Sequence, residues 1–278
     1  MSDKAEEVYM NLQVAIASDK VILPTLPEIA IKIRDEAEAE NSSIVTIAAI
    51  LSQDASLTTR LIQVANSPLY RGNNAIEDIQ MAISRLGIKI VKDLVIRLAM
   101  KQMYQSTSEV LDRHFRAAWS ASVEVAAISR MLASMTPISN EHALLAGLIH
   151  NIGTLPILVF AEEDDQLFND NEALSEVIHS IGGRVGKLIL ESWQFAPELI
   201  DAVADCYKFN RRHAGDADLT DIIQVSILQG GFAEGCPGTD DWTRIQAFEK
   251  LDLDTEMDSI NIEENQAMLE EARSSIDL

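Results

Sequence analysis

The sequence predicts an all-α fold, a multi-helical orthogonal bundle of the kind built from short helices, and three observations support this. Apolar residues recur at three- and four-residue spacing along almost the whole chain, which is the period of a helix with one buried face. No convincing run of alternating apolar and polar residues, the pattern of a strand, is found. Prolines, glycines and capping residues recur at short intervals, which favours several short helices and tight turns over a coiled coil.

The N-terminal part of the chain is expected to form a helix, a proline-rich break and a second helix. A first helix is indicated by three apolar residues spaced by four, Val8, Leu12 and Ile16. The segment "LPTLPE" interrupts it with two prolines. Thr25 and Glu28 have the spacing of a capping box, so a second helix is predicted to run to about Glu40.

Four further helices are predicted before residue 105. Pro68 disfavours helical geometry at Ser67, and Gly87 is suited to end a helix. These signals and the apolar spacing place the helices at residues 44–52, 55–65, 79–86 and 88–104. The polar residues 105–108 then mark a boundary.

The remaining sequence predicts a second group of helices and an acidic extension. The helices are expected at residues 111–135, 140–152, 172–180, 185–193, 197–207 and 219–229. From residue 234 the composition becomes loop-like and strongly acidic. We therefore expect an N-terminal subdomain (1–106), a second helical subdomain (107–232) and an acidic C-terminal extension (233–278).

Composition excludes several classes of function. The formal net charge is -22, which repels phosphate backbones, so no direct nucleic-acid binding is expected. No apolar run approaches about 18 residues, and the charged N-terminus lacks the apolar core of a signal peptide. The two cysteines, Cys206 and Cys236, form no zinc-like cluster. These features predict a cytoplasmic protein that is not bound to a membrane.

Four motifs occur in an order that resembles one known family. They are "LPTLPEIAIKI", "LSQDASLTTRLIQVANSPLY", "IQMAISRLGIKIVKDLV" and "ALLAGLIHNIGTL". The chain resembles the HDOD (HD-related output domain) family over roughly residues 21–212. The resemblance implies a bacterial, all-helical relative of the HD and HD-GYP phosphohydrolases that is associated with signalling and regulation. It also implies that the complete metal-binding set is usually missing.

The positions that the resemblance assigns to metal ligands are mostly occupied by other residues here. His150 is present, but Asn151 stands where the HD doublet has an aspartate. Ala121 and Gly182 occupy places where the family pattern often has histidines, and Cys206 with Tyr207 corresponds to a frequent histidine pair. HD hydrolysis needs several deprotonated ligands around one or two metal ions. We therefore expect no bound metal and no other cofactor, although His179 lies close enough in sequence to swing towards the site.

His150 itself has a structural interpretation. Ala143, Gly147 and His150 share one helix face, so the small residues would let another helix approach, and the imidazole would hydrogen-bond a carbonyl or a side chain at the crossing. The segment "GGRVG" (182–186) lacks the context of a phosphate-binding loop and predicts a tight turn with small-residue packing. Cys206 is expected to be a buried apolar side chain rather than a nucleophile.

A second stretch, "NSPLYRG", carries candidate contact residues. Asn66 and Ser67 are suited to capping a helix end, and Tyr70 and Arg71 could face a ligand or a partner, as could His150 and Asn151 in the other motif. Structural capping is the favoured interpretation of Asn66 and Ser67. Surface exposure of Tyr70 would shift the balance towards recognition.

The sequence thus predicts a non-catalytic signalling or regulatory protein that acts through protein partners or a small ligand. Two alternatives remain open at this stage. One is a residual metal-dependent phosphohydrolase that uses His150, Asn151 and His179. The other is a sensor of a nucleotide second messenger, which would need a basic pocket containing Arg184 or the pair Arg211 and Arg212.

Overall fold

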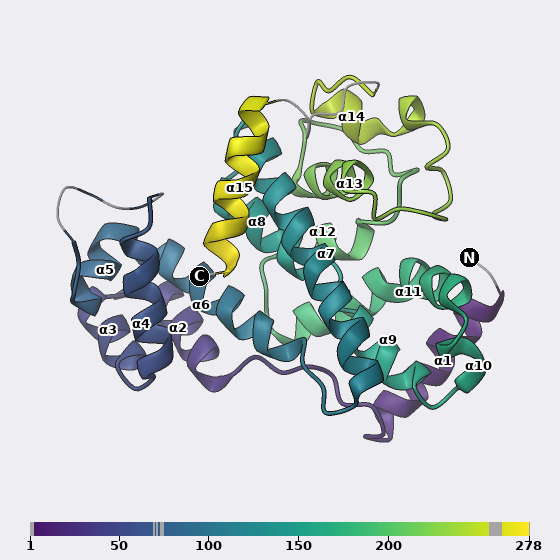
Figure 1. Cartoon of the computed structure of the whole chain (residues 1–278), viewed down its shortest axis with the longest axis horizontal. Coiled ribbons are helices and arrows are strands. Elements are labelled where there is room, and N and C mark those ends of the chain that lie inside the picture. The colour runs from purple at the N-terminus through teal and green to yellow at the C-terminus, as the bar shows by residue number, and fades with distance from the viewer. Residues whose placement is uncertain (1–2, 69, 71, 73–74, 256–262, 278) are drawn as a thin grey trace. The chain divides into compact units, whose positions relative to one another are not determined.

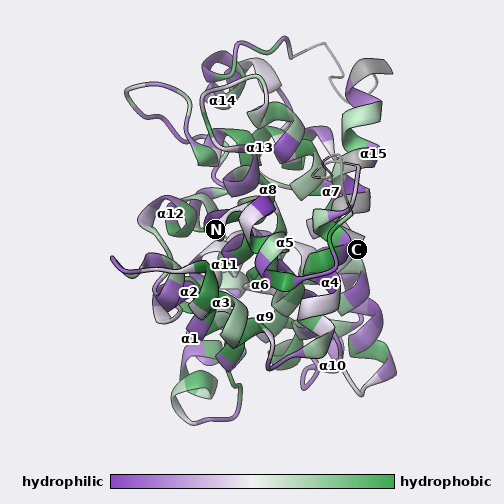
Figure 2. Cartoon of the chain, turned by 90° about the vertical axis from the view of Figure 1, so that its left-hand side faces the viewer, coloured by the Kyte–Doolittle hydropathy of each residue, from purple (hydrophilic) through white to green (hydrophobic). Residues whose placement is uncertain are grey.

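The computed structural model describes residues 3–277 except 69, 71, 73–74 and 256–262, and the described residues form helices and loops without a strand (Figure 1). The prediction of an all-α fold is therefore confirmed. Apolar and polar stretches alternate along most of the helices (Figure 2), as expected for helices that bury one face. Most predicted helix ends agree with the structure to within a few residues.

The chain divides into two compact units. One contains Met1–Thr25 and Tyr104–Leu269, and the other contains Leu26–Met103 and Glu270–Leu278. The expected boundary at residue 106 lies close to the observed one at 103, but the expected assignment of the first residues differs. Helix α1 (Asp3–Ala17) groups with the larger unit because it buries apolar residues such as Val8 and Leu12 and packs on α11 (Asn171–Ser192) and α9 (Thr154–Ala161). Residues 233–255 also group with the larger unit.

The described residues of the smaller unit include α2 (Glu28–Glu38), α3 (Ile44–Leu51), α4 (Ala55–Ala65), α5 (Ile79–Leu86), α6 (Ile88–Met103) and the part of α15 from Glu270. The side chains of Ser43, Asp54 and Asp78 cap three of them at the N-terminus. The capping box predicted at Thr25 is absent. Pro27 takes the N-cap position of α2 with no side-chain hydrogen bond, since helical geometry begins only at Glu28.

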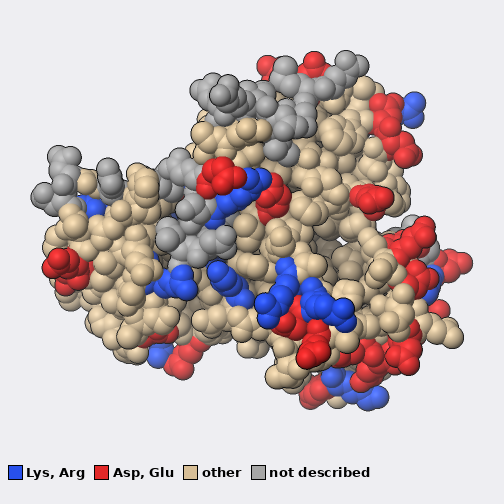
Figure 3. Space-filling view, viewed as in Figure 1, with Lys and Arg blue, Asp and Glu red and all other residues tan. Residues whose placement is uncertain are grey.

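The larger unit is built around α7 (Glu109–Ala133), α8 (Asn140–Ile149) and α11. Its other elements are α9, α10 (Asp165–Phe168), α12 (Pro197–Asp205), α13 (Leu219–Gln229), the 3-10 helix η1 (Trp242–Arg244) and α14 (Gln246–Lys250); α15 (Glu263–Asp277) follows. Acidic side chains gather over α1, α9 and α10 on the face shown in Figure 3. Much of the negative charge therefore lies on a solvated surface of this unit.

The segment "GGRVG" forms no turn, which corrects one prediction. Gly182, Gly183 and Gly186 all lie inside the continuous helix α11. Each glycine costs about 1 kcal/mol in a helix interior, but two of them allow another helix to approach. A Cβ atom on Gly183 would lie 2.7 Å from the carbonyl oxygen of Ala204, and one on Gly186 would lie 2.6 Å from Cγ1 of Val203. Close packing against α12 therefore offsets the poor helix propensity, and the predicted small-residue packing is confirmed.

Helices α7 and α8 cross at Gly147, as the small-residue face predicted. A Cβ atom at Gly147 would lie 2.4 Å from Cα of Ala126 and 2.7 Å from its backbone nitrogen. Ala143 on the same face is fully buried. The two backbones are therefore in direct contact, which fixes the position of the residues that follow α8.

One stretch corrects the prediction that no apolar run reaches membrane-spanning length. Within the described residues, Asn140–Ala161 is long and apolar enough by length and composition, but 89% of its apolar window is buried inside the protein. It contains α8, a turn and α9. Its apolar character is explained by its position in the core of the larger unit.

The contact at Gly147 predicts the effect of adding a single methyl group. Gly147→Ala should lower the free energy of unfolding by at least about 2 kcal/mol, because a backbone clash cannot be relieved by rotating a side chain. Gly182→Ala is the matched control, since its Cβ atom would meet only Cγ2 of Ile178 at 4.0 Å. That variant should gain up to about 1 kcal/mol from helix propensity. Urea unfolding followed by circular dichroism measures both, and equal effects would contradict the packing assigned to Gly147.

Candidate functional site

The candidate site lies where the turn between α8 and α9 meets α11. His150 caps the C-terminus of α8, and residues 150–153 form the turn. A Cβ atom on Gly153 would lie 2.1 Å from the carbonyl oxygen of Gly182, so the turn rests directly on the backbone of α11. This close approach places His150 and Asn151 inside the protein, where they are 1% and 7% exposed.

The imidazole of His150 makes a local hydrogen bond. Its Nδ1 lies 2.6 Å from the carbonyl oxygen of Gly147, one turn earlier in α8. Because a carbonyl oxygen can only accept, Nδ1 carries the proton and Nε2 keeps the lone pair. Burial lowers the pKa of His150 to about 4, so the ring is neutral at pH 7. A backbone carbonyl was one of the expected partners, but it belongs to the same helix and not to the neighbouring one.

Asn151 is held by three hydrogen bonds. Its Oδ1 accepts from the hydroxyl groups of Tyr104 and Ser122, each at 2.7 Å, and its Nδ2 donates to the carbonyl oxygen of Ala118 at 3.0 Å. Tyr104 and Ser122 are themselves buried, and burial raises the pKa of the Tyr104 hydroxyl, so it stays a donor. Both lone pairs of Oδ1 are therefore engaged, and the amide of Asn151 ties α7 to the turn.

This arrangement is a poor fit to a metal ion. A ligating oxygen at residue 151 would have to give up a buried hydroxyl partner, and it carries no negative charge to compensate. Among the described residues, the single group of three or more His, Cys, Asp or Glu side chains close enough to share an ion lies elsewhere, at His213, Asp218 and Asp221. The donor set beside His150 thus differs from the one that metal-assisted hydrolysis requires.

A cavity of about 250 Å³ borders this turn. Of the predicted site positions, Ala121 and Asn151 line it. The other polar lining residues are His114, Thr154, Asn171, Ser175, His179 and Tyr207. The other lining residues are mainly small or apolar: Ala117, Ala118, Leu158, Leu174, Ile178 and Phe232. The cavity therefore combines apolar with polar side chains, and none of its described lining residues carries a carboxylate.

Three predicted positions, His150, Gly182 and Cys206, do not line this cavity. Gly182 packs its carbonyl group against Gly153, and His179, one turn earlier in α11, lines the cavity instead. Cys206 is fully buried, as predicted, and its Sγ donates to the carbonyl oxygen of Val203 at 3.2 Å. Burial also raises the pKa of this thiol. In the pair Cys206 and Tyr207, the tyrosine is the residue that reaches the cavity.

Three rings lie close together at this point of the structure. The ring centroid of Tyr207 is 4.7 Å from that of His179 and 6.3 Å from that of His150. Burial lowers the pKa of His179 to about 4 and raises the pKa of Tyr207. All three rings are therefore neutral at pH 7. Sequence spacing had suggested His179 as a neighbour of the site, but the contact with Tyr207 depends on how α11 and α12 pack.

The cluster of His213, Asp218 and Asp221 contains its own cation. The guanidinium group of Arg211 donates to both carboxylates, and Nε2 of His213 lies 2.9 Å from Oδ2 of Asp221. Asp218 and Asp221 also form the capping box of α13. These side chains therefore fasten residues 211–218 to α13, and the arginine neutralises part of the charge that a metal would need.

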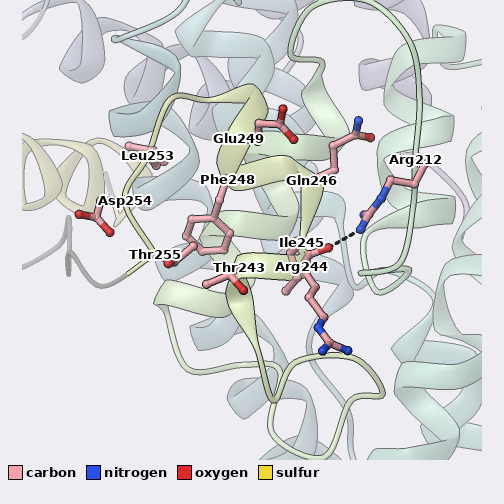
Figure 4. A pocket seen from close by; sticks show the side chains of 10 residues that line it. All are labelled: Arg212, Thr243, Arg244, Ile245, Gln246, Phe248, Glu249, Leu253, Asp254 and Thr255. Atoms are coloured by element: carbon pink, nitrogen blue, oxygen red, sulfur yellow. Dashed lines mark hydrogen bonds between the residues drawn. The ribbon is translucent and has the colours of Figure 1, made fainter.

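Another cavity, of about 350 Å³, lies beside η1 and α14 (Figure 4). Arg212 lines it and donates a hydrogen bond to the carbonyl oxygen of Arg244. Arg211 is paired with aspartates, as described above. The two arginines considered for a nucleotide pocket therefore already hold the surrounding loops in place.

The candidate contact residues in "NSPLYRG" belong to the smaller unit. Asn66 is the C-cap of α4; its Nδ2 donates to the carbonyl oxygen of Ile76 at 2.7 Å, and its Oδ1 accepts from the Ile76 amide at 2.8 Å. Ser67 is buried and Tyr70 is half-buried, while Arg71 lies outside the described residues. The two bonds of Asn66 close the loop between α4 and α5, in agreement with the capping interpretation.

Comparison with known proteins identifies the family of this chain. The model of the HDOD domain matches residues 23–209. The chain belongs to the HDOD family. A curated relative, an uncharacterized protein of Treponema pallidum (strain Nichols), is 21% identical over 213 residues, which cover 73% of this chain and 41% of the relative. This HDOD chain thus spans about two fifths of that relative's length.

Solved structures of bacterial proteins share the HDOD fold of this chain. A "putative metal-dependent phosphohydrolase" from Shewanella amazonensis SB2B is 27% identical, with a TM-score of 0.82 and coverage of 99% of this chain and 100% of the other. An HDOD domain protein of unknown function from Geobacter sulfurreducens is 20% identical, with a TM-score of 0.65 and coverage of 97% and 98%. A "putative signal transduction protein" from Marinobacter aquaeolei VT8 is 20% identical, with a TM-score of 0.64 and coverage of 99% and 67%.

The hydrogen bonds of Asn151 predict that an aspartate at this position lowers the stability of the protein. Asn151→Asp replaces the Nδ2 donor with an oxygen that faces the Ala118 carbonyl, so the free energy of unfolding at pH 7 should fall by about 2–3 kcal/mol. The folded-state pKa of the new carboxyl group should lie above its unfolded value of about 3.9. The deficit should therefore be largest above the folded pKa and shrink as the pH falls towards 3.9.

Denaturant unfolding at pH 4 and pH 7 tests this prediction. Asn11→Asp is the matched control, because it makes the same charge change at an exposed position of α1. A deficit at pH 7 that is the same for both variants would contradict the role of the Ala118 carbonyl.

The buried histidines predict a pH dependence of stability. The pKa values of His150 and His179 are lowered from 6.5 to about 4, so the unfolded chain binds protons more readily between these pH values. Their contribution to stability is complete above pH 6.5 and is lost as the pH falls to about 4. His150→Gln should therefore flatten the curve of unfolding free energy against pH in this window. Parallel curves for the variant and the parent protein would refute the assignment.

Proposed function

We propose that this chain is a non-catalytic signalling or regulatory member of the HDOD family that acts in the cytoplasm through recognition of a protein partner or a small ligand. The observation that carries the proposal is the engagement of Asn151. The residue at the diagnostic HD position holds α7 to the α8–α9 turn through one Nδ2 donor, and both lone pairs of its Oδ1 accept hydrogen bonds. A scaffold role of this kind conflicts with metal ligation.

The shape of the cavity beside Asn151 also supports recognition. Its wall combines small and apolar side chains with hydroxyl, amide and aromatic groups, among them the rings of His179 and Tyr207. Such a surface suits the binding of a partner side chain or a small molecule. The same place in a hydrolase would need carboxylates and imidazoles that converge on an ion.

A residual phosphohydrolase is the second candidate function. It is favoured by one observation, the 27% identity and nearly complete coverage shared with the Shewanella protein named a "putative metal-dependent phosphohydrolase". His150, with its unprotonated Nε2, is the one imidazole that this function would inherit at the HD doublet. The enzyme would have to hold its metal without an aspartate at residue 151.

Metal loading and hydrolysis separate the two functions. The purified chain is incubated with Mn²⁺, Fe²⁺ or Zn²⁺, desalted, and analysed for metal content and for cleavage of bis(4-nitrophenyl) phosphate. We expect less than 0.1 equivalent of metal and no hydrolysis above that of the buffer. A stoichiometric ion together with hydrolysis, both lost in His150→Gln, would overturn the proposal.

The matched control for this experiment is His213→Gln. It removes a histidine from the cluster of His213, Asp218 and Asp221, the other place where an ion could gather. Metal that is lost in His213→Gln and kept in His150→Gln would therefore belong to that cluster, and the proposal for the HD position would stand.

A further inference from the structure

A further cavity in the larger unit, of about 770 Å³, is also lined by His179 and Tyr207. Its walls come from α11, the end of α12, the segment that follows α12, α1 and the loop at residues 235–238. The volume is in the range of sites that hold small organic molecules. It is distinct from the cavity beside Asn151, with which it shares only His179 and Tyr207.

Part of this cavity is made by segments outside the family match. The HDOD model covers residues 23–209, whereas Glu6 of α1 and the loop at residues 235–238 lie before and after it. Helix α1 is anchored by buried residues such as Tyr9 and Leu12. The cavity therefore depends on flanking segments that pack on α11, and its position differs from that of the HD metal cage.

One wall of the cavity already binds a carboxylate. Nη1 of Arg184 lies 2.6 Å from Oε2 of Glu6, and Nη2 lies 3.3 Å from Oε1, so both oxygens are engaged. The guanidinium carbon lies 3.5 Å from the centroid of the Tyr9 ring. This stacking orients the guanidinium plane. Arg184 is thus a preformed site for a planar anion, and Glu6 is its internal occupant.

Aromatic side chains form another wall of the cavity. Tyr207 lies against His179 at 4.7 Å with a tilt of 40°, and its edge contacts Phe209 at 6.4 Å. Because burial keeps His179 and Tyr207 neutral at pH 7, this wall is uncharged. An uncharged aromatic surface of this kind is suited to packing against an aromatic ring.

The charges around the cavity limit the charge of its ligand. Arg184 and Lys208 face Glu6 and Glu176 among the lining residues, so the formal charges balance. Lys208 also pairs with Asp205. A ligand with several negative charges, such as a nucleotide, would meet uncompensated repulsion here and from the acidic protein as a whole. A single negative charge is matched by Arg184.

We propose that this cavity binds a small aromatic monocarboxylate, whose carboxylate replaces Glu6 on Arg184 and whose ring packs against Tyr207 and His179. The proposal deepens the recognition function proposed above and rests on it. Glu6 acts as a competing internal carboxylate. Ligand binding releases Glu6 and weakens one of the contacts that hold α1 on α11, which couples the cavity to the flanking helix.

Isothermal titration calorimetry on the whole chain tests the ligand class with five probes. Benzoate and indole-3-acetate carry both a ring and a carboxylate; benzyl alcohol lacks the charge, acetate lacks the ring, and adenosine monophosphate carries a phosphate. We expect the two aromatic carboxylates to bind at least about tenfold more tightly than the other three. Equal binding of benzyl alcohol, tighter binding of adenosine monophosphate, or no binding of any probe at millimolar concentration would overturn the proposal.

Two pairs of variants test the competition at Arg184. Glu6→Gln removes the internal carboxylate and should tighten benzoate binding about two- to fivefold, while Glu7→Gln, the same charge change at an exposed neighbour, should leave it unchanged. Arg184→Gln should weaken binding about tenfold or more, whereas Arg116→Gln, which breaks an exposed ion pair on α7, should have no effect. Identical results within either pair would refute the role given to Glu6 or to Arg184.

One further variant distinguishes a loss of binding in the cavity from a loss caused by unfolding. Ser180→Phe fills the cavity from α11 and leaves the pair of Glu6 and Arg184 intact, so binding should be lost while circular dichroism and the melting temperature stay unchanged. Binding that survives this substitution would place the ligand elsewhere. The result of the binding experiment does not depend on the result of the hydrolysis assay. If the protein binds aromatic carboxylates and also hydrolyses a phosphodiester, the proposed non-catalytic function is overturned and the proposed ligand class stands.

Discussion

The direct contact of helix backbones around the turn between α8 and α9 is the constraint on which the rest of the larger unit depends. Gly147 admits the backbone of α7, and Gly153 sits against the carbonyl group of Gly182 on α11. These approaches leave no room for a side chain at either glycine. They place Asn151 where its amide can connect α7 to the turn, and they bury His150 so deeply that its ring stays neutral.

The same contacts give the residue at the HD position a structural role. An aspartate at residue 151 would be useful as a metal ligand, but here an asparagine supplies a donor that the carbonyl oxygen of Ala118 needs. The hydroxyl groups of Tyr104 and Ser122 donate hydrogen bonds to the amide oxygen of Asn151. The position therefore contributes to stability through a polar network in the core, which is a sufficient reason for the residue without any catalytic role.

The site was predicted from the sequence only in part. The replacement of the HD aspartate by Asn151 and the missing histidine at Ala121 could be identified from the motifs, and both residues line the cavity. Gly182 was placed at a family histidine position, and in the structure it lies inside a helix of 22 residues in which His179, one turn earlier, lines the cavity. Two helices with a break were expected because isolated glycines disfavour helices, and the compensating contact with α12 has no signature in the local sequence.

The sequence by itself determined the helical fold, most helix ends and the family, because these follow from apolar periodicity, local capping and motif order. Only the tertiary structure decided the partners of Asn151 and the grouping of α1 with the larger unit. It also brought Glu6 onto Arg184, 178 residues apart in the chain. The physical reason is that hydrogen bonds, ion pairs and cavities depend on distances between segments far apart in sequence, and those distances are set by how closely helices such as α8 and α11 pack.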